Sequence, residues 1–184
     1  NLALVLRAQG DLVAAEAEAR RALDMRAMLL APDHPSIAQG FNVLAVILRD
    51  AGRHAEAEPL LERADAIYLT RLGPDHPSLA INRSALAYVA LALRRPARAE
   101  ALFRSALEIH ERAGQQANLV IARPLLGMGR TLLALDRPDD ARPYLHRALT
   151  VQRAHLPEAH SETAGPRAEL ARLDGPRPDA PAGR

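Results

Sequence analysis

The chain has 184 residues, 48% of them hydrophobic and 3% aromatic, and a formal net charge of +2 at pH 7. It contains no cysteine, which excludes disulfides and thiolate metal sites, and its 24 basic residues are all Arg. A core with two Phe and no Trp must depend on closely packed Ala and Leu, which predicts an all-α fold.

Helical periodicity predicts four helix pairs in chain order. One face of the third predicted helix has the i, i+3, i+4, i+7 spacing, with Phe41, Leu44, Ala45 and Leu48. The same pattern along the chain places the pairs at 1–8 with 11–30, 35–50 with 53–72, 77–93 with 96–113, and 117–134 with 138–155. None of these helices can bury its apolar stripe alone, so neighbouring pairs must stack into one continuous core.

The carboxyl-terminal end carries two expectations. Residues 166–174 fit the first helix of a fifth repeat, so the repeat array would span 1–174 and end on a capping helix. The segment 175–184 is rich in Pro and Gly and is expected to be a disordered tail or a linker. The sequence has no run of 18 apolar residues, so a soluble, cytoplasmic protein without membrane contact is expected.

The amino-terminal end begins within a helical pattern, at Asn1 rather than at Met. We therefore expect a longer protein in which the first helix pair is truncated here. The truncation would expose Leu2, Leu4 and Leu6. An upstream helix should cover these side chains in the full protein, and the fragment should self-associate or fray through this end.

The pentapeptide PDHPS occurs at 32–36 and again at 74–78, so the two copies lie 42 residues apart. Other columns repeat at the same interval, which indicates an internal repeat rather than a chance match. Two of these columns hold only alanine: Ala15, Ala57, Ala99 and Ala141, and then Ala22, Ala64, Ala106 and Ala148. Small residues at such positions allow two helix backbones to approach closely.

The pentapeptide is interpreted as a signal that ends one helix and starts the next. Pro74 lacks an amide donor and ends the preceding helix, Asp75 is expected to cap the following helix, and Pro77 suits its first turn. A metal site would need three or four convergent ligands, and this corner offers too few. At the equivalent corner His160 is kept but Asp is replaced by Ala159, so no metal or cofactor is expected.

The small residues Ala45, Ala57 and Ala64, with Leu44, Leu48, Gly52 and Leu61 between them, resemble the tetratricopeptide repeat pattern. The 42-residue period and the phrase GPDHPS are similar to its kinesin-light-chain-like branch. The third and fourth repeats depart from the pattern, because Arg94 and Asp136 stand where the turn Gly is expected. The resemblance implies a right-handed α-solenoid of antiparallel helix pairs whose first helices line a concave groove that binds a protein or peptide.

The first helices carry the candidate binding residues on the face opposite the core stripe. We define this set as the first-helix surface: Arg7, Asn42, Val46, Arg49, Ser84, Tyr88, Arg123 and Arg130. It holds four Arg and no Asp or Glu, which suits an extended peptide with acidic and apolar side chains. The alternative is that these Arg side chains only solvate a helix face.

The sequence therefore predicts a protein-interaction scaffold, as an arm of a larger regulatory protein, and not an enzyme. No convergent acid–base or nucleophile set and no phosphate-binding glycine motif is present. A nucleic-acid-binding helical repeat is the alternative. It would require a continuous basic stripe with aromatic side chains for stacking, and Tyr88 alone is a small platform.

Overall fold

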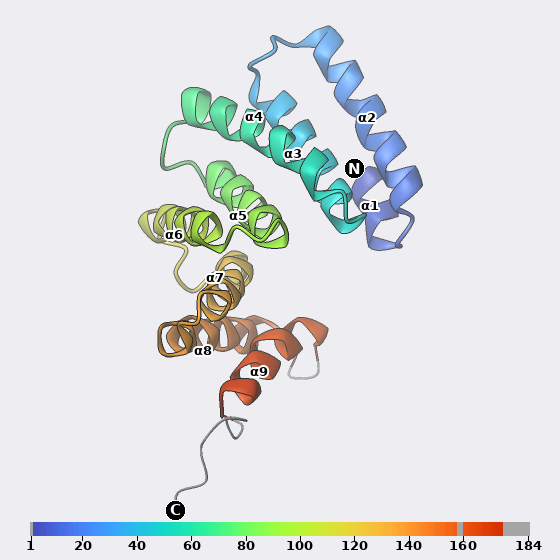
Figure 1. Cartoon of the computed structure of the whole chain (residues 1–184). Coiled ribbons are helices and arrows are strands. Elements are labelled where there is room, and N and C mark those ends of the chain that lie inside the picture. Colours follow the sequence, from blue (N-terminus) through green and yellow to red (C-terminus); the bar gives the residue numbers. More distant parts are fainter. Residues whose placement is uncertain (1, 158–159, 175–184) are drawn as a thin grey trace, which may run out of the picture. The chain divides into compact units, whose positions relative to one another are not determined.

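The structure, a computed structural model, describes residues 2–157 and 160–174. Every regular element in these ranges is helical (Figure 1). The helices are α1 (Leu2–Ala8), α2 (Leu12–Leu29), α3 (Pro35–Asp50), α4 (His54–Leu72), α5 (Pro77–Ala92), α6 (Pro96–Arg112), the 3₁₀ helix η1 (Leu119–Ile121), α7 (Ala122–Ala134), α8 (Pro138–His155) and α9 (Ser161–Asp174). The predicted all-α solenoid of antiparallel helix pairs is confirmed, and the tail predicted at 175–184 lies outside the described residues.

The helices form two compact units, with α1 to α6 in residues 1–116 and η1 to α9 in residues 117–184. In the first unit each helix packs against the next one in the chain, and α3 also contacts α5. In the second unit α8 packs against both α7 and α9. The odd-numbered helices are the first helices of the pairs, and the even-numbered helices are the second helices.

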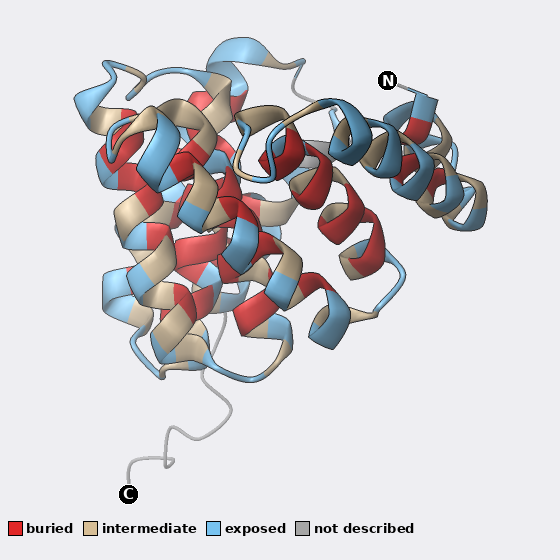
Figure 2. Ribbon diagram, turned by 90° about the horizontal axis from the view of Figure 1, so that it is seen from above, coloured by how far each residue is buried: buried red, intermediate tan, exposed pale blue. Residues whose placement is uncertain are grey.

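The alanine columns lie inside the molecule, where helices meet. Every member of the first column is fully buried: Ala15, Ala57, Ala99 and Ala141. In the second column Ala64, Ala106 and Ala148 are fully buried, whereas Ala22 in α2 is only partly buried. Figure 2 shows that buried residues follow the helix faces that neighbours cover, while exposed residues occupy the opposite faces. Small side chains at these contacts allow the close backbone approach that the repeat predicts.

The turn inside each pair has the same geometry in all four repeats. Gly10 and Gly52 have positive φ, and so do Arg94 at 59° and Asp136 at 56°. The amide after each of these residues donates to a carbonyl five residues earlier, for example Arg53 to Leu48 at 2.9 Å. The left-handed turn is therefore retained without glycine, at a cost of about 1 kcal/mol for each side chain.

The corners that enter α3 and α5 are capped by histidine. The Nδ1 atoms of His34 and His76 accept from the amides of Ser36 and Ser78, each at 3.1 Å. The prediction that Asp75 caps α5 was wrong, because this carboxylate instead accepts from Arg112 Nε at 2.6 Å.

Asp33 and Asn118 also follow the repeat, each at its own corner. Asp33 pairs with Arg71 of α4, so both pentapeptides tie a corner to the following second helix. The pentapeptide is missing before η1, yet Asn118 has the position of the capping histidines and accepts from Val120 N at 3.0 Å. The cap is thus a property of the repeat position and not of one residue type.

Pro124 affects how the first helix of the fourth pair begins. Residues 119–134 form η1 and α7, so the helix is complete in length but starts with a 3₁₀ turn. Pro124 cannot donate to the carbonyl of residue 120, and without that bond the first turn tightens. Helix α9 begins at Ser161, earlier than the residue 166 predicted for the capping helix, and the Thr163 amide donates to the His160 carbonyl at 3.0 Å to start it.

Ion pairs connect successive second helices. Arg53 at the start of α4 donates to Glu16 of α2 at 2.7 Å, and Arg95 at the start of α6 donates to Glu58 of α4 at 2.8 Å. The hydrogen bond from Arg20 lowers the pKa of Glu16. Partial burial raises this pKa, but the hydrogen bond and charge of Arg53 lower it further, so it lies below its usual range. Glu16 therefore stays ionised at neutral pH and can hold both Arg residues.

Candidate functional site

The centre of the candidate site lies at the end of α3, where Arg49 contacts α5. Its guanidinium carbon is 5.8 Å from the ring centroid of Tyr88, within the range of a cation–π contact. The Tyr88 ring meets Phe103 of α6 edge-on, with centroids 5.0 Å apart and an interplanar angle of 83°. A buried aromatic residue thus fixes the ring over which Arg49 lies.

Asp50 supplies the negative charge at this site. Its carboxylate accepts from Arg49 Nη2 at 2.7 Å and from Arg7 Nε of α1 at 2.6 Å. Partial burial disfavours the charged form of Asp50, but the hydrogen bonds from Arg49 and Arg7 outweigh this effect and hold its pKa below the usual range. At neutral pH two guanidinium groups therefore share one carboxylate, and the cluster keeps one net positive charge.

A polar pair lies further along α3. Asn42 Nδ2 donates to Asn82 Oδ1 of α5 at 3.0 Å, and Asn82 Nδ2 donates to the Leu61 carbonyl of α4 at 2.9 Å. Asn82 is fully buried, whereas Asn42 is half-buried. The amide pair ties the first helices of two repeats to the second helix between them.

The remaining predicted residues differ in their accessibility. Val46 is half-buried and packs against the core of the first unit. Ser84 is 9% exposed, and its hydroxyl donates to the Ala80 carbonyl at 2.9 Å. In the second unit Arg123 is exposed, and Arg130 Nε lies 3.0 Å from Glu169 Oε1 of α9. Ser84 is therefore the least accessible of the predicted set, and Arg130 already has a carboxylate partner.

Sequence reasoning missed Asp50, Asn82 and Glu169. Asp50 directly follows Arg49, but helical phase alone places these two neighbours on different sides of the helix. Their side chains nevertheless meet at the carboxyl-terminal end of α3. Asn82 stands in a column with Gly40 and Pro124, so the repeat gives no signal for a buried amide.

Two other kinds of site, metal centres and membrane spans, are absent from the part of the chain that the structure describes. No three His, Asp or Glu side chains within residues 2–157 and 160–174 are grouped so that they could hold a metal ion. Across the same residues, no helix is both long enough and apolar enough to cross a bilayer.

Several solved structures have a similar fold. The chain is similar to a putative kinesin light chain with nearly identical TPR-like repeats from Podosopora anserina, at 23% identity and a TM-score of 0.75, over 94% of this chain and 82% of that one. A substituted form of that protein gives a TM-score of 0.76 at 23% identity, covering 94% and 81%. BtubC (BKLC) from P. vanneervenii gives 0.72 at 22% identity, covering 100% and 83%.

Sequence profiles agree with this likeness of fold. Comparison with curated proteins gives no match. The profile of one tetratricopeptide repeat group matches residues 1–70 and 36–112, and that of a second group matches residues 125–162. These matches cover more than half of the sequence and follow the helix pairs described above, so the chain belongs to the tetratricopeptide repeat family.

Proposed function

We propose that the first unit binds an extended acidic peptide along its part of the first-helix surface, with Arg49 and Tyr88 as the central contacts. As a tetratricopeptide repeat protein it is a helical scaffold for protein interaction. The observation that supports the acidic ligand is the position of Arg49, which lies between the Asp50 carboxylate and the Tyr88 ring. A guanidinium held in this way is oriented before a ligand arrives, so less side-chain entropy is lost on binding.

The charge balance of the first unit favours a carboxylate ligand. Arg7 and Arg49 share Asp50, so one positive charge is left for a partner. Arg side chains form paired hydrogen bonds with carboxylates, and Tyr88 offers a flat apolar surface beside them. The half-buried Asn42 amide has further hydrogen-bonding capacity for a peptide backbone.

Substitution of Arg49 by Glu tests this proposal. A fluorescein-labelled peptide of alternating Glu and Leu is titrated with the full chain, and binding is followed by fluorescence anisotropy. Arg49→Glu places a second carboxylate beside Asp50, so we expect the affinity to fall by at least about tenfold, or about 1.4 kcal/mol. Arg130→Glu tests the second unit separately by the same measurement.

Arg104→Glu is the matched control, because it makes the same charge change on an exposed side chain of α6 that pairs with Glu100. It should leave the affinity for the acidic peptide unchanged. Equal binding by the wild type and Arg49→Glu would contradict the proposal. Equal binding of a peptide with Lys in place of Glu would also contradict it.

A second part of the proposal concerns self-association through α1. Leu2 is 57% exposed and Val5 is 52% exposed, whereas Leu44 and Ile47 at the same repeat positions of α3 are 2% and 0% exposed. We propose that two copies associate weakly through these α1 side chains. Sedimentation velocity should show a dimer whose fraction rises with concentration and falls with Val5→Asp; a monomer at every concentration would contradict this.

A further inference from the structure

A group of polar side chains lies at the boundary between α4 and α5, inside the first unit. Arg83 of α5 donates to the Asp65 carboxylate of α4 from Nε at 3.1 Å and from Nη2 at 3.3 Å. Its third nitrogen, Nη1, donates to the Ser105 hydroxyl of α6 at 2.6 Å. The Arg83 and Asp65 side chains are only 20% and 22% exposed, so two charged groups have lost most of their contact with water here.

Asn82, the residue before Arg83, adds a buried amide at the same level of α5. Its Nδ2 donates to the Leu61 carbonyl of α4 at 2.9 Å, and its Oδ1 accepts from Asn42 of α3 at 3.0 Å. Polar contacts therefore join α3, α4, α5 and α6 at one level of the first unit. We call the residues that carry them the polar layer: Asp65, Asn82, Arg83 and Ser105.

The corresponding positions of neighbouring repeats hold a different set of residues. At the position of Asp65 the other repeats have leucine: Leu23, Leu107 and Leu149. At the position of Arg83 the second and fourth repeats have a bulky apolar residue: Phe41 and Leu125. Ser105 has the position of Arg63, whose guanidinium carbon lies 4.2 Å from the centroid of the Phe41 ring. A set of Asp, Arg and Ser thus stands at α4, α5 and α6 where α2, α3 and α4 have Leu, Phe and Arg.

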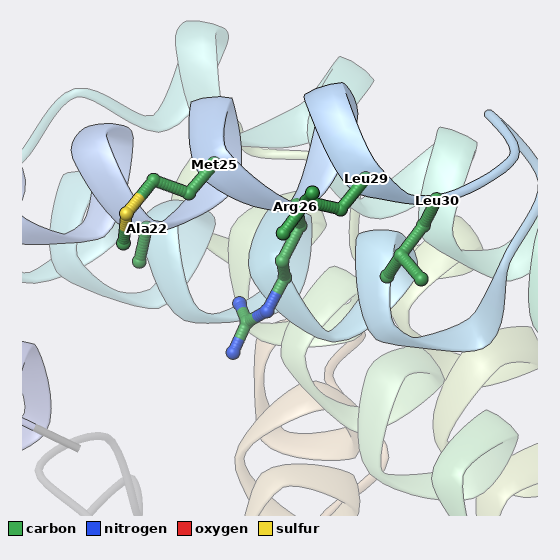
Figure 3. Close-up of a pocket in the computed structure, with 5 residues that line it drawn as sticks. All are labelled: Ala22, Met25, Arg26, Leu29 and Leu30. Atoms are coloured by element: carbon green, nitrogen blue, oxygen red, sulfur yellow. The ribbon is translucent and has the colours of Figure 1, made fainter.

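The boundary between α2 and α3 shows the apolar form of this layer. Leu23 of α2 packs against the core cluster that contains Phe41 of α3. A Cβ atom on Gly40, at the position of Asn82, would lie 2.8 Å from Leu23 Cδ1. Figure 3 shows an open hollow of about 340 Å³ that is lined by other residues of α2 and its carboxyl-terminal cap: Ala22, Met25, Arg26, Leu29 and Leu30. Leu23 therefore faces α3, as Asp65 faces α5.

The polar layer separates two apolar clusters where α5 meets α4. Towards its amino-terminal end α5 contributes to a cluster with Ala64 and Tyr68 of α4, through Leu79 and Ala80. Towards its carboxyl-terminal end it contributes to another cluster with Leu61 of α4, through Ala85, Leu86 and Val89. The buried face of α5 is therefore apolar at both ends and polar between them.

We propose that the polar layer forms a joint between α4 and α5, so that the helices before it and the helices after it unfold in separate steps. The two Arg83–Asp65 bonds are longer than the about 2.7–2.9 Å of strong charge-assisted bonds, so they offset only part of the hydration that both groups lose. When the boundary opens, these groups are hydrated again. Opening an apolar boundary gives no such compensation.

A repeat array unfolds in steps that its nearest-neighbour interfaces decide. A boundary that costs less to expose becomes the limit of a cooperative unit, because the helices on one side can unfold while those on the other side stay folded. In the first unit this limit falls between α4 and α5. We therefore expect α3 and α4 to form one cooperative unit and α5 and α6 to form another.

The joint also crosses the candidate site. Arg49 belongs to α3, before the joint, and Tyr88 belongs to α5, after it, so their 5.8 Å contact exists only while the joint is closed. The hydrogen bond between Asn42 and Asn82 is broken by the same opening. The joint is thus a conformational device within the first-helix surface. It follows from the polar layer alone and does not depend on the acidic-peptide proposal.

Hydrogen exchange measured by mass spectrometry tests the joint. The full chain is placed in deuterated buffer, and the protection factors of amides in α3 and α4 are compared with those in α5 and α6. In the wild type we expect the two sets to differ by at least about tenfold. The triple variant Asp65→Leu, Arg83→Phe, Ser105→Arg reproduces the apolar form of the layer, and there the difference should fall below about threefold.

The double variant Asp33→Ala, Arg71→Ala is the matched control. It also removes an Asp–Arg pair that involves α4, but these two side chains are 51% and 52% exposed. It should leave the difference in protection as it is in the wild type. If circular dichroism shows that the triple variant loses helix, the double variant Asp65→Leu, Arg83→Leu takes its place.

Two results would overturn the proposal. The first is equal protection of the two helix sets in the wild type, which would mean that the first unit unfolds in one step across this boundary. The second is an unchanged difference in a folded variant with the apolar layer, which would mean that the polar residues do not set the limit between the steps.

Discussion

Replacing Phe103 with alanine is expected to lower the free energy of unfolding by about 3–5 kcal/mol. The side chain is fully buried in α6 and contacts the Tyr88 ring edge-on. Its removal leaves a cavity between α5 and α6 and takes away the support that fixes Tyr88 in the candidate site. Urea denaturation followed by far-UV circular dichroism measures the stability, and we expect a lower midpoint. The affinity for the acidic peptide should fall in the same variant.

Ile81→Ala is the matched control in the neighbouring helix. Ile81 is 48% exposed in α5, so its truncation should change the stability by no more than about 0.5 kcal/mol. Phe103→Leu should give a loss between those of the two alanine variants, because Leu fills part of the cavity. Equal stability of Phe103→Ala and the wild type would mean that α5 and α6 close over the space.

Much of the fold could be predicted from the sequence because every repeat must bury the same faces. The alanine columns at 42-residue intervals fix where second helices touch their neighbours, and these positions are buried in all four pairs apart from Ala22. The exception lies in the pair whose first helix begins with the sequence itself, so that α1 has 7 residues whereas α3 has 16. Periodicity thus predicted both the core and the helices that form it.

The identity of the caps could not be read from the same pattern. In PDHPS both Asp and His can accept a hydrogen bond from the following amides, and Asp is among the residues that are preferred at helix N-caps. The structure places His76 at the cap position, one residue later, while Asp75 turns to Arg112 of α6. That choice depends on the position of Arg112, which lies 37 residues further along the chain. A local sequence pattern does not contain this information.

The charge of the candidate site could be predicted only in part. The first-helix phase identified Arg7 and Arg49, and the structure brings both to one carboxylate. Their shared partner Asp50 lies outside that phase, and Glu169 reaches Arg130 from α9, a contact between helices that the phase does not predict. These long Arg side chains can reach carboxylates that the helical phase does not predict. Such contacts, not periodicity, decide how many positive charges remain for a ligand.

Replacing Gly129 with alanine is expected to lower the free energy of unfolding by up to about 2 kcal/mol, because overpacking costs about 1–3 kcal/mol and helix propensity returns about 1 kcal/mol. A Cβ atom at this position of α7 would lie 2.5 Å from Leu145 Cδ2 and 2.7 Å from Leu145 Cγ. Leu145 is fully buried in α8, so its branch point cannot move away without shifting the helix. Urea denaturation measures the change.

Gly40→Ala is the matched control for Gly129→Ala. Its Cβ would lie 2.8 Å from Leu23 Cδ1 and 3.2 Å from Arg26 Nη1, which are the ends of flexible side chains on α2. These ends can rotate away, so the gain in helix propensity should keep the variant within about 1 kcal/mol of the wild type. In α3 the position of Gly129 is held by Ala45, which packs in one core cluster with Leu61, the counterpart of Leu145. If Gly129→Ala is as stable as the wild type, α7 and α8 have moved apart to make room for the Cβ atom, and the close contact at Gly129 is not required.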